Sequence, residues 1–341
     1  MGIALSWWLR VGAIALAILS AGSGSAHADV VIATETRPTT VSAFGGLVLW
    51  SSAVPATGQY VLRSWNGTSV ETLPIPARDA PFDADLGPDA HGRPVAVYSR
   101  CTSEELLATG PFPDYAAGRG CDLFRYRFDA RREERLRSLS SPSQDEFTPT
   151  IWGTHVAFAR DVGNAKRRAS QLYVGTLSSG QPTRRIRGGD DPFERAFCAS
   201  RARPSRLDLR ASRLVFAWDE VCGGDFDCQG QRGGFTPPVA QVWDVSIAPG
   251  GRRRRVQSVC SLGDENHGLP FASPALAQDR LLYLVYGRSR SDSPYQVRRR
   301  RGRNVIDRPA PWASRALTAD GSRLVVGQDA GENTFNIVVL G

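Results

Sequence analysis

Residues 147–189 read FTPTIWGTHVAFARDVGNAKRRASQLYVGTLSSGQPTRRIRGG, and this stretch decides the fold. Its runs are rich in Val, Phe, Tyr and Leu, which pleated and half-buried strands favour. A short strand, a turn and an apolar strand are followed by a variable loop, an aromatic strand, a tight turn at Ser179-Gly180 and an Arg-rich strand. The stretch therefore predicts four short consecutive strands.

The same order of strands and turns recurs along the chain. Six copies are recognisable, and they begin at residues 41, 82, 147, 207, 271 and 313. In the first copy Asn66-Gly67 separates two alternating runs, which is the strongest short hairpin signal. Repeated units of four short strands predict an all-β chain folded as a β-propeller with six four-stranded blades.

The last copy ends with FNIVVL (335–340) and lacks its fourth strand. An unassigned apolar run, VVIAT (30–34), stands near the other end of the chain. We expect this N-terminal run to supply the missing outer strand and to close the ring, because closure removes an exposed sheet edge.

Two segments carry a family resemblance. LGPDAHGRPVAVYSR (86–100) and LTADGSRLVVGQD (317–329), each followed by a strand such as CDLFRYRF or FNIVVL, resemble the repeat of TolB-like six-bladed propellers. The hairpin QLYVGTLSSGQPTRRIRGG (171–189) fits the same repeat, whereas Trp152-Gly153-Thr154 and Ala277-Gln278-Asp279 replace its usual turn. The resemblance implies a single TolB-like propeller domain over residues 29–341. Its implication for function is broad, because this fold serves translocation partners, peptidase-associated domains, lyases and binding scaffolds.

Residues 1–28 have the features of a secretory signal peptide. Arg10 precedes the apolar run VGAIALAILSA (11–21), and Ala26-His27-Ala28 gives an A-x-A cleavage pattern before Asp29. The apolar run is shorter than the roughly 20 residues that a membrane span needs. We therefore expect Sec-type export to the cell envelope or the exterior, with no transmembrane segment after cleavage, although a retained anchor is the alternative.

Export changes the interpretation of the six cysteines. An even number in an oxidising compartment indicates disulfides, and local context favours Cys101–Cys121 and Cys222–Cys228, each pair bracketing a loop. Cys198–Cys260 would then remain, although sequence alone leaves 15 pairings open. A zinc site is the alternative, but there is no C-x-x-C spacing and no nearby His.

The candidates for catalysis and metal binding lie in loops. His267 stands beside Asp264 and Glu265, and this trio could move protons or bind a metal. His91 and His155 are interpreted as solvent-facing residues of a turn and a strand start. Two acidic groups could bind calcium through their carboxylate oxygens: Asp83, Asp85 and Asp89; and Asp219, Glu220, Asp225 and Asp227. A turn explains the first group better. No cofactor is otherwise predicted.

Arginine dominates the positive charge. The net charge is +8, and 41 of the 42 basic residues are arginine, which codon bias in a GC-rich genome would also explain. The runs 184–187 and 252–255, together with Arg131-Arg132, fall on or beside the outermost hairpin of their copies, and the run 298–301 with Arg303 does so with a shifted register. We expect them to prevent edge-to-edge pairing. A polyanion site at Arg252, Arg253, Arg254 and Arg255 is the alternative, with an anionic cell-wall polymer or extracellular nucleic acid as its ligand.

The sequence thus predicts a secreted, non-enzymatic propeller that binds a protein or an anionic envelope polymer and has no specific nucleic-acid partner. The competing hypothesis is an extracellular hydrolase or lyase acting on a glycan or peptide, with carboxylates, His or a metal near the channel.

Overall fold

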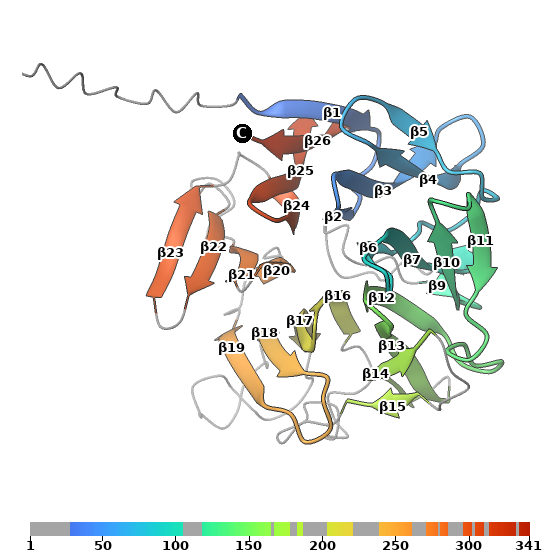
Figure 1. Cartoon of the computed structure of the whole chain (residues 1–341), viewed down its shortest axis with the longest axis vertical. Coiled ribbons are helices and arrows are strands. Elements are labelled where there is room, and N and C mark those ends of the chain that lie inside the picture. Colours follow the sequence, from blue (N-terminus) through green and yellow to red (C-terminus); the bar gives the residue numbers. More distant parts are fainter. Residues whose placement is uncertain are drawn as a thin grey trace, which may run out of the picture.

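The computed structural model describes most of the chain, and these residues form six four-stranded antiparallel sheets and one two-stranded sheet (Figure 1). The described ranges are 28–104, 118–164, 167–177, 183–186, 203–220, 239–260, 271–278, 280–285, 296–301, 304–309, 314–331 and 334–341.

Three sheets come from the first half of the chain and follow one another in sequence. Their strands are β2 (Val41–Phe44), β3 (Leu47–Val54), β4 (Gln59–Trp65) and β5 (Val70–Thr72); β6 (Ala84–Pro88), β7 (Pro94–Arg100), β10 (Asp122–Arg127) and β11 (Arg132–Arg135); and β12 (Glu146–Trp152), β13 (His155–Asn164), β14 (Arg167–Thr176) and β15 (Arg184–Arg185). The two-stranded sheet, β8 (Ser103–Glu104) and β9 (Gly118–Arg119), is inserted between β7 and β10.

The second half of the chain supplies the other three sheets. Their strands are β16 (Arg203–Arg210), β17 (Arg213–Glu220), β18 (Val239–Ser246) and β19 (Arg253–Cys260); β20 (Phe271–Ala277), β21 (Arg280–Val285), β22 (Gln296–Arg301) and β23 (Asn304–Pro309); and β24 (Ser314–Asp320), β25 (Arg323–Gly331) and β26 (Thr334–Leu340) with β1 (Val30–Glu35).

The sheets are arranged radially around a central axis (Figure 1). The first strand of each repeat is innermost, and each of these strands contacts the next in the order β2, β6, β12, β16, β20, β24 and back to β2. This arrangement of four-stranded antiparallel sheets confirms the predicted all-β propeller fold.

The N-terminal strand closes the ring. β1 pairs antiparallel with β26 and is the outermost strand of the sheet that β24 begins, which confirms the predicted closure. At the end of β1, the buried Glu35 carboxylate accepts hydrogen bonds from Trp50 Nε1 (2.7 Å) and Ser52 Oγ (2.6 Å) on β3. The closing strand is therefore fastened both to its own sheet and to the next one.

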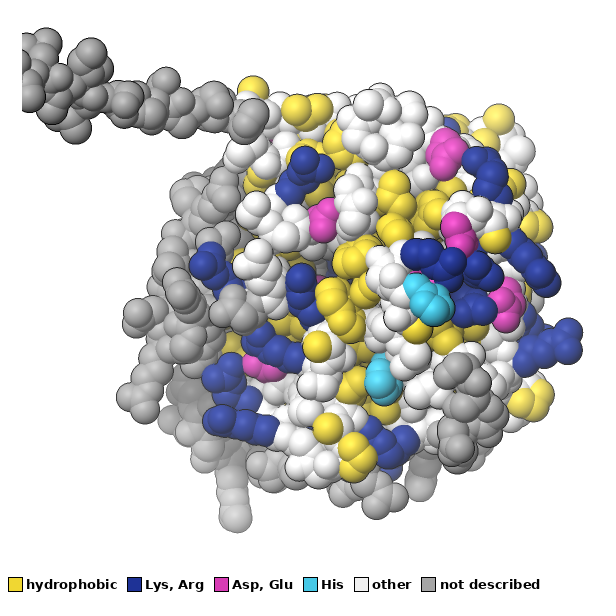
Figure 2. All heavy atoms as spheres, viewed as in Figure 1, with side chains coloured by type: hydrophobic (Ala, Val, Ile, Leu, Met, Phe, Trp, Pro, Cys, Tyr) yellow, Lys and Arg dark blue, Asp and Glu magenta, His cyan; other side chains and the backbone are white. Residues whose placement is uncertain are grey.

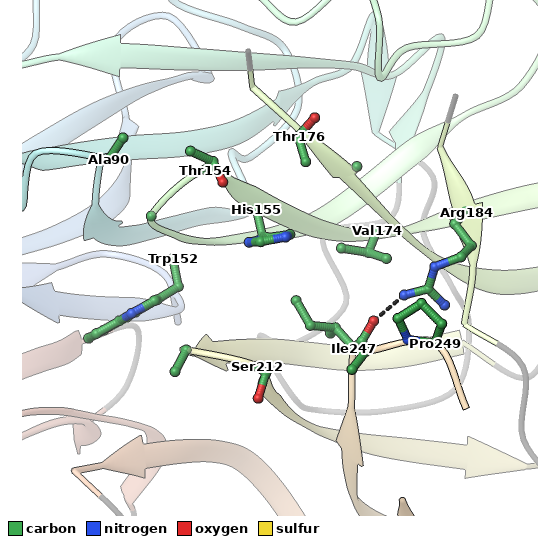
Figure 3. Close-up of a pocket in the computed structure, with 14 residues that line it drawn as sticks. Ala90, Trp152, Thr154, His155, Val174, Thr176, Arg184, Ser212, Ile247 and Pro249 are labelled. Atoms are coloured by element: carbon green, nitrogen blue, oxygen red, sulfur yellow. Dashed lines mark hydrogen bonds between the residues drawn. The ribbon is translucent and has the colours of Figure 1, made fainter. Parts of the chain in front are cut away.

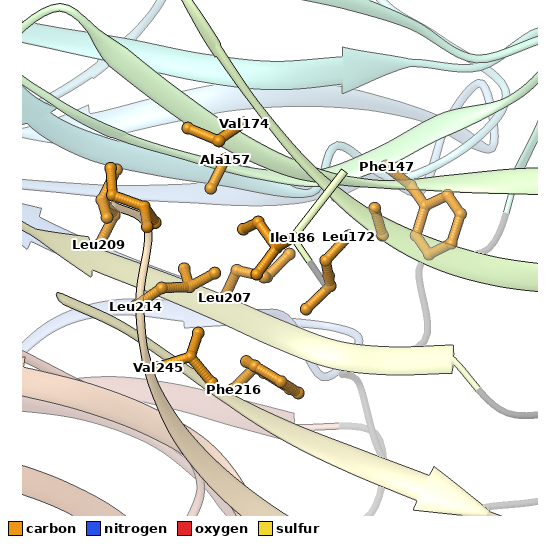
Figure 4. Packing of buried hydrophobic residues seen from close by; sticks show 12 residues of the cluster. Phe147, Ala157, Leu172, Val174, Ile186, Leu207, Leu209, Leu214, Phe216 and Val245 are labelled. Atoms are coloured by element: carbon orange, nitrogen blue, oxygen red, sulfur yellow. The ribbon is translucent and has the colours of Figure 1, made fainter. Parts of the chain in front are cut away.

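Apolar side chains fill the spaces between neighbouring sheets. Figure 4 shows the cluster between the β12–β15 sheet and the β16–β19 sheet, where Leu172 and Ile186 meet Leu207, Leu214 and residues around them. Alternate residues of a strand point to opposite faces, so both faces of each sheet pack against a neighbour. This packing fixes the angle between adjacent sheets and hence the position of the turns that connect their strands.

The disulfide prediction is confirmed in part. Cys101 is bonded to Cys121, which ties the end of β7 to the start of β10. Cys198, Cys222 and Cys228 lie outside the described residues, and the Cys260 side chain is not described, so the other two pairs stay predictions. Residues 1–27 also lie outside the described part. Within the described ranges, no helix is long and apolar enough to cross a membrane.

Candidate functional site

Polar side chains on the inner strands connect four successive pairs of neighbouring sheets, from β2–β6 to β16–β20. Ser42 Oγ accepts a hydrogen bond from the Leu86 amide (2.9 Å), and Thr150 Oγ1 accepts one from the Leu209 amide (2.9 Å). In the next interface Asp208 Oδ2 accepts from the Leu276 amide (2.6 Å). The same hydrogen bond thus recurs at equivalent positions of successive repeats: a side chain of one inner strand accepts it from a backbone amide of the next inner strand.

Asp85 is the most connected member of this series. Its Oδ1 accepts from Ser42 Oγ (2.7 Å), and its Oδ2 accepts from Thr150 Oγ1 (2.7 Å) and the Ile151 amide (3.3 Å). Burial raises the pKa of Asp85, while the charge of Arg206 opposes that shift. The side chain therefore joins three consecutive inner strands.

Asp83 and Asp208 also have perturbed pKa values. Burial raises the pKa of Asp83 to about 6, although Asp83 accepts hydrogen bonds from Ser99 and from the Thr148 amide. Burial, together with the negative charge of Asp85, raises the pKa of Asp208 to about 7. Such shifts are found at catalytic sites and equally in structural networks. Each of these carboxylates accepts a hydrogen bond from a backbone amide of the following inner strand. A role in holding the strands together therefore accounts for all three raised pKa values.

The calcium hypothesis for the first acidic group does not fit this geometry. Asp85 lies in strand β6 and not in a turn, and both of its oxygens bind the flanking inner strands. Asp89 caps the adjacent β6–β7 turn, accepting from the His91 and Arg93 amides. Within the described ranges, no group of three or more His, Cys, Asp or Glu residues is placed to hold a metal ion.

Arg206 spans two repeats. It is 7% exposed, and its Nη1 donates to the Leu317 carbonyl on β24 (3.0 Å), past the intervening strand β20. Its charge acts on Asp85 and Asp208. The guanidinium therefore joins inner strands that are not neighbours.

Aromatic and cationic side chains meet where the inner strands end in their first turns. The rings of Phe44 and Trp152 pack edge to face with centroids 5.7 Å apart. The Arg210 guanidinium lies 4.8 Å from the Trp152 ring centroid, within the range of a cation–π contact. Figure 2 shows apolar side chains around the centre of the face that it views and basic side chains spread over that same face.

A cleft opens beside Trp152, between the β12–β15 sheet and the β16–β19 sheet (Figure 3). Its volume is about 810 Å³, within the range of about 300–1,000 Å³ typical of ligand pockets. The cleft residues come from turns and strand ends: Ala90, Trp152, Gly153, Thr154, His155, Val174, Gly175, Thr176, Arg184, Ala211, Ser212, Ile247, Ala248 and Pro249. Among the described residues, the set combines apolar side chains with two basic ones and holds no carboxylate.

Arg184 bridges the two sheets at the outer end of the cleft. Its Nη2 donates to the Ile247 carbonyl, the bond drawn in Figure 3. Arg184 also lines a second depression of about 740 Å³, which shares Ala248 and Pro249 with the cleft and reaches Arg185 and Arg253. The two depressions therefore lie next to each other along the seam between the sheets.

The predicted arginine runs lie on several sheets. Arg132, Arg184-Arg185 and Arg253–Arg255 lie on outermost strands, whereas Arg298–Arg301 lie on β22, one strand in from the edge strand β23. Within the polyanion candidate, Arg254 Nη2 binds Asp244 Oδ2 at 2.9 Å, and Arg213 binds the same carboxylate. Arg252 and Arg255 are exposed, and Arg253 lines the second depression.

Most of the catalytic and metal candidates from the sequence cannot be placed relative to this site. His267, Asp264 and Glu265 lie outside the described residues, as do Asp225 and Asp227. Asp219 lies on β17, but its side chain is not described. His91 is exposed in the β6–β7 turn, and His155 opens β13, as expected. The sequence analysis assigned no function to Trp152, His155 or Arg210. Trp152 and His155 flank the first turn of one repeat, and Arg210 precedes the first turn of the next repeat. An aromatic ring, an imidazole and a guanidinium at these two turns were the available signal.

Comparison with known proteins gives a fold likeness alone. No family model matches the chain, and no curated protein matches it by sequence. Solved structures similar to it include TolB from Acinetobacter baumannii, with 12% identity and a TM-score of 0.49 over 87% of this chain and 64% of that one. The chain thus spans slightly less than two thirds of TolB.

Two further similar structures have different described roles. The gluconolactonase XC5397 from Xanthomonas campestris is 14% identical, with a TM-score of 0.49 over 92% of this chain and 89% of that one. The β-propeller domain of the Trilobed protease from Pyrococcus furiosus is 6% identical, with a TM-score of 0.47 over 89% and 82%.

Proposed function

We propose that this chain is an exported, non-catalytic β-propeller that binds a partner protein at the cleft between the β12–β15 and β16–β19 sheets. The observation that carries the proposal is the cleft itself, a cavity of about 810 Å³ formed by turns on a rigid ring of sheets. Binding sites are commonly built from loops that a rigid scaffold positions.

The roles of the buried carboxylates support binding over catalysis. A general acid or base must reach the proton that it transfers. Asp85 instead accepts a hydrogen bond from the Ile151 amide, and Asp208 accepts one from the Leu276 amide. Asp83 likewise accepts a hydrogen bond from the Thr148 amide. Their raised pKa values follow from burial within this network. The signal-like segment 1–28 supports a place for the protein in the cell envelope or outside the cell.

Site-specific photocrosslinking in the native cell tests this function. The photoreactive amino acid p-benzoylphenylalanine is placed at Ser212, an exposed cleft residue in the β16–β17 turn. The matched control is Ser322, an exposed serine in the corresponding β24–β25 turn, away from the cleft. We expect a discrete adduct with one protein, identified by mass spectrometry, at Ser212 and not at Ser322. Absence of an adduct at Ser212, or equal adducts at both positions, would contradict the proposed function.

A further inference from the structure

The chemistry of the cleft indicates what it binds. Its apolar lining residues are Trp152, Val174, Ile247 and Pro249; Trp152 and Pro249 are accessible, whereas Val174 and Ile247 are each only 5% exposed and belong to the core between the sheets. Figure 3 shows His155, Val174 and Arg184 along one wall, with Ile247 and Pro249 opposite. Among the described residues, neither the cleft nor the second depression is lined by a carboxylate. The surroundings are therefore apolar at the centre and basic at the edges.

The shape indicates an extended ligand. The cleft and the second depression share Arg184, Ala248 and Pro249, so they adjoin along the seam, and an extended segment is long enough to contact both. Arg184 lies at their junction, with Arg185 and Arg253 further along the path. Electrostatic complementarity selects partners whose charges oppose those of the surface.

We infer that the cleft takes an extended acidic segment of the partner protein, with apolar side chains on the apolar lining of the cleft and carboxylates near Arg184 and His155. This inference rests on the proposed function and names the chemistry of the partner. A peptide matches both the apolar and the basic parts of the cleft, because alternate residues of an extended chain point to opposite sides and can be apolar on one side and acidic on the other. An anionic polysaccharide would supply the charge but no apolar side chain for the centre of the cleft.

Fluorescence polarisation with labelled peptides tests the inference. The probe is a short peptide that alternates Glu and Leu, and its comparison peptide has Gln in place of every Glu. We expect the wild-type protein to bind the Glu peptide about tenfold or more tightly than the Gln peptide, a difference that shrinks at high salt because exposed charges are screened. Polygalacturonate, added as a competitor, represents an anionic polymer.

Ala248 is the residue of choice for the variant, because it is exposed and lines both depressions. Ala248→Glu places a carboxylate in the path of the ligand, and Ala248→Gln is the neutral control of the same size. Ala248→Gln carries the effect of the larger side chain alone, so like-charge repulsion is expected to weaken binding of the Glu peptide about fivefold or more in Ala248→Glu relative to Ala248→Gln. Unchanged melting temperatures show that both variants fold.

The outcomes separate the inference from the function on which it rests. Equal affinity for the Glu and Gln peptides, or equal effects of the two Ala248 variants, would overturn the acidic-peptide inference while a Ser212 adduct still supported the function. Strong polygalacturonate binding without Glu-peptide binding would overturn it in favour of a polymer. An adduct whose crosslinked segment is basic would also contradict it.

Discussion

Replacing Glu35 with alanine should destabilise the protein by loosening the strand that closes the ring. The Glu35 carboxylate accepts one hydrogen bond from Trp50 Nε1 and one from Ser52 Oγ, and it lies 3.8 Å from Arg63 Nη1. A hydrogen bond to a charged group contributes about 1.5–3 kcal/mol, so losing two of them should lower the free energy of unfolding by about 3–6 kcal/mol. Two buried donors would also be left without an acceptor.

Glu35→Gln separates hydrogen bonding from charge. Its amide oxygen can still accept from Trp50 Nε1, and its nitrogen can donate to Ser52 Oγ, so we expect a smaller loss than for Glu35→Ala. Glu71→Ala is the control, because Glu71 makes an exposed ion pair with Arg131, a kind of contact that contributes at most about 1 kcal/mol. Urea unfolding followed by tryptophan fluorescence gives the three free energies. A Glu35→Ala loss below about 1 kcal/mol, or equal losses for Glu35→Ala and Glu35→Gln, would refute the reasoning.

Deleting residues 29–36 should lower the melting temperature sharply, because β26 would lose its outer partner; unchanged melting would refute closure by β1. The pKa of Asp83 is raised to about 6, so its contribution to stability is greatest below about pH 4 and is lost as the pH rises through 6. The free energy of unfolding, measured with urea, should therefore fall less steeply between about pH 4 and pH 7 in Asp83→Asn than in the wild type. An equally steep fall in both proteins would contradict the raised pKa of Asp83. Leu214→Ala should lower the free energy of unfolding by about 2–5 kcal/mol, because Leu214 is fully buried between two sheets; a loss under 1 kcal/mol in the same assay would be inconsistent with that packing. Replacing Cys101 and Cys121 with serine should cost about 2–5 kcal/mol, and a double variant as stable as wild type would exclude a stabilising role for the bond.

Much of the fold could be predicted because its determinants are local in sequence. Asn66-Gly67 marks a hairpin by itself, and the loop between Cys101 and Cys121 is bracketed by strand-like runs, so that their pairing follows from neighbouring residues. The closing strand could be predicted by counting the strands in each repeat, because the last repeat lacks one strand and residues 30–34 supply one.

The cleft could not be predicted in this way. His155, Ser212 and Ala248 belong to three turns that lie far apart in sequence, and only the packing of two sheets brings them to one cavity. The sequence also misled at Asp85, where a run of acidic residues and glycine indicated a turn. That aspartate lies on an inner strand, because its hydrogen bonds to Ser42 and Thr150 satisfy a polar group that burial would otherwise penalise.

The yield of protein adduct at position 212 relative to position 322, with p-benzoylphenylalanine at each site in the native cell, tests the central claim most directly. The two serines occupy corresponding turns of different sheets, and only Ser212 lines the cleft. A partner that binds the cleft predicts one discrete adduct at 212 and none at 322. Equal yields at the two positions, or no adduct at 212, would contradict the assignment of this cleft as the binding site.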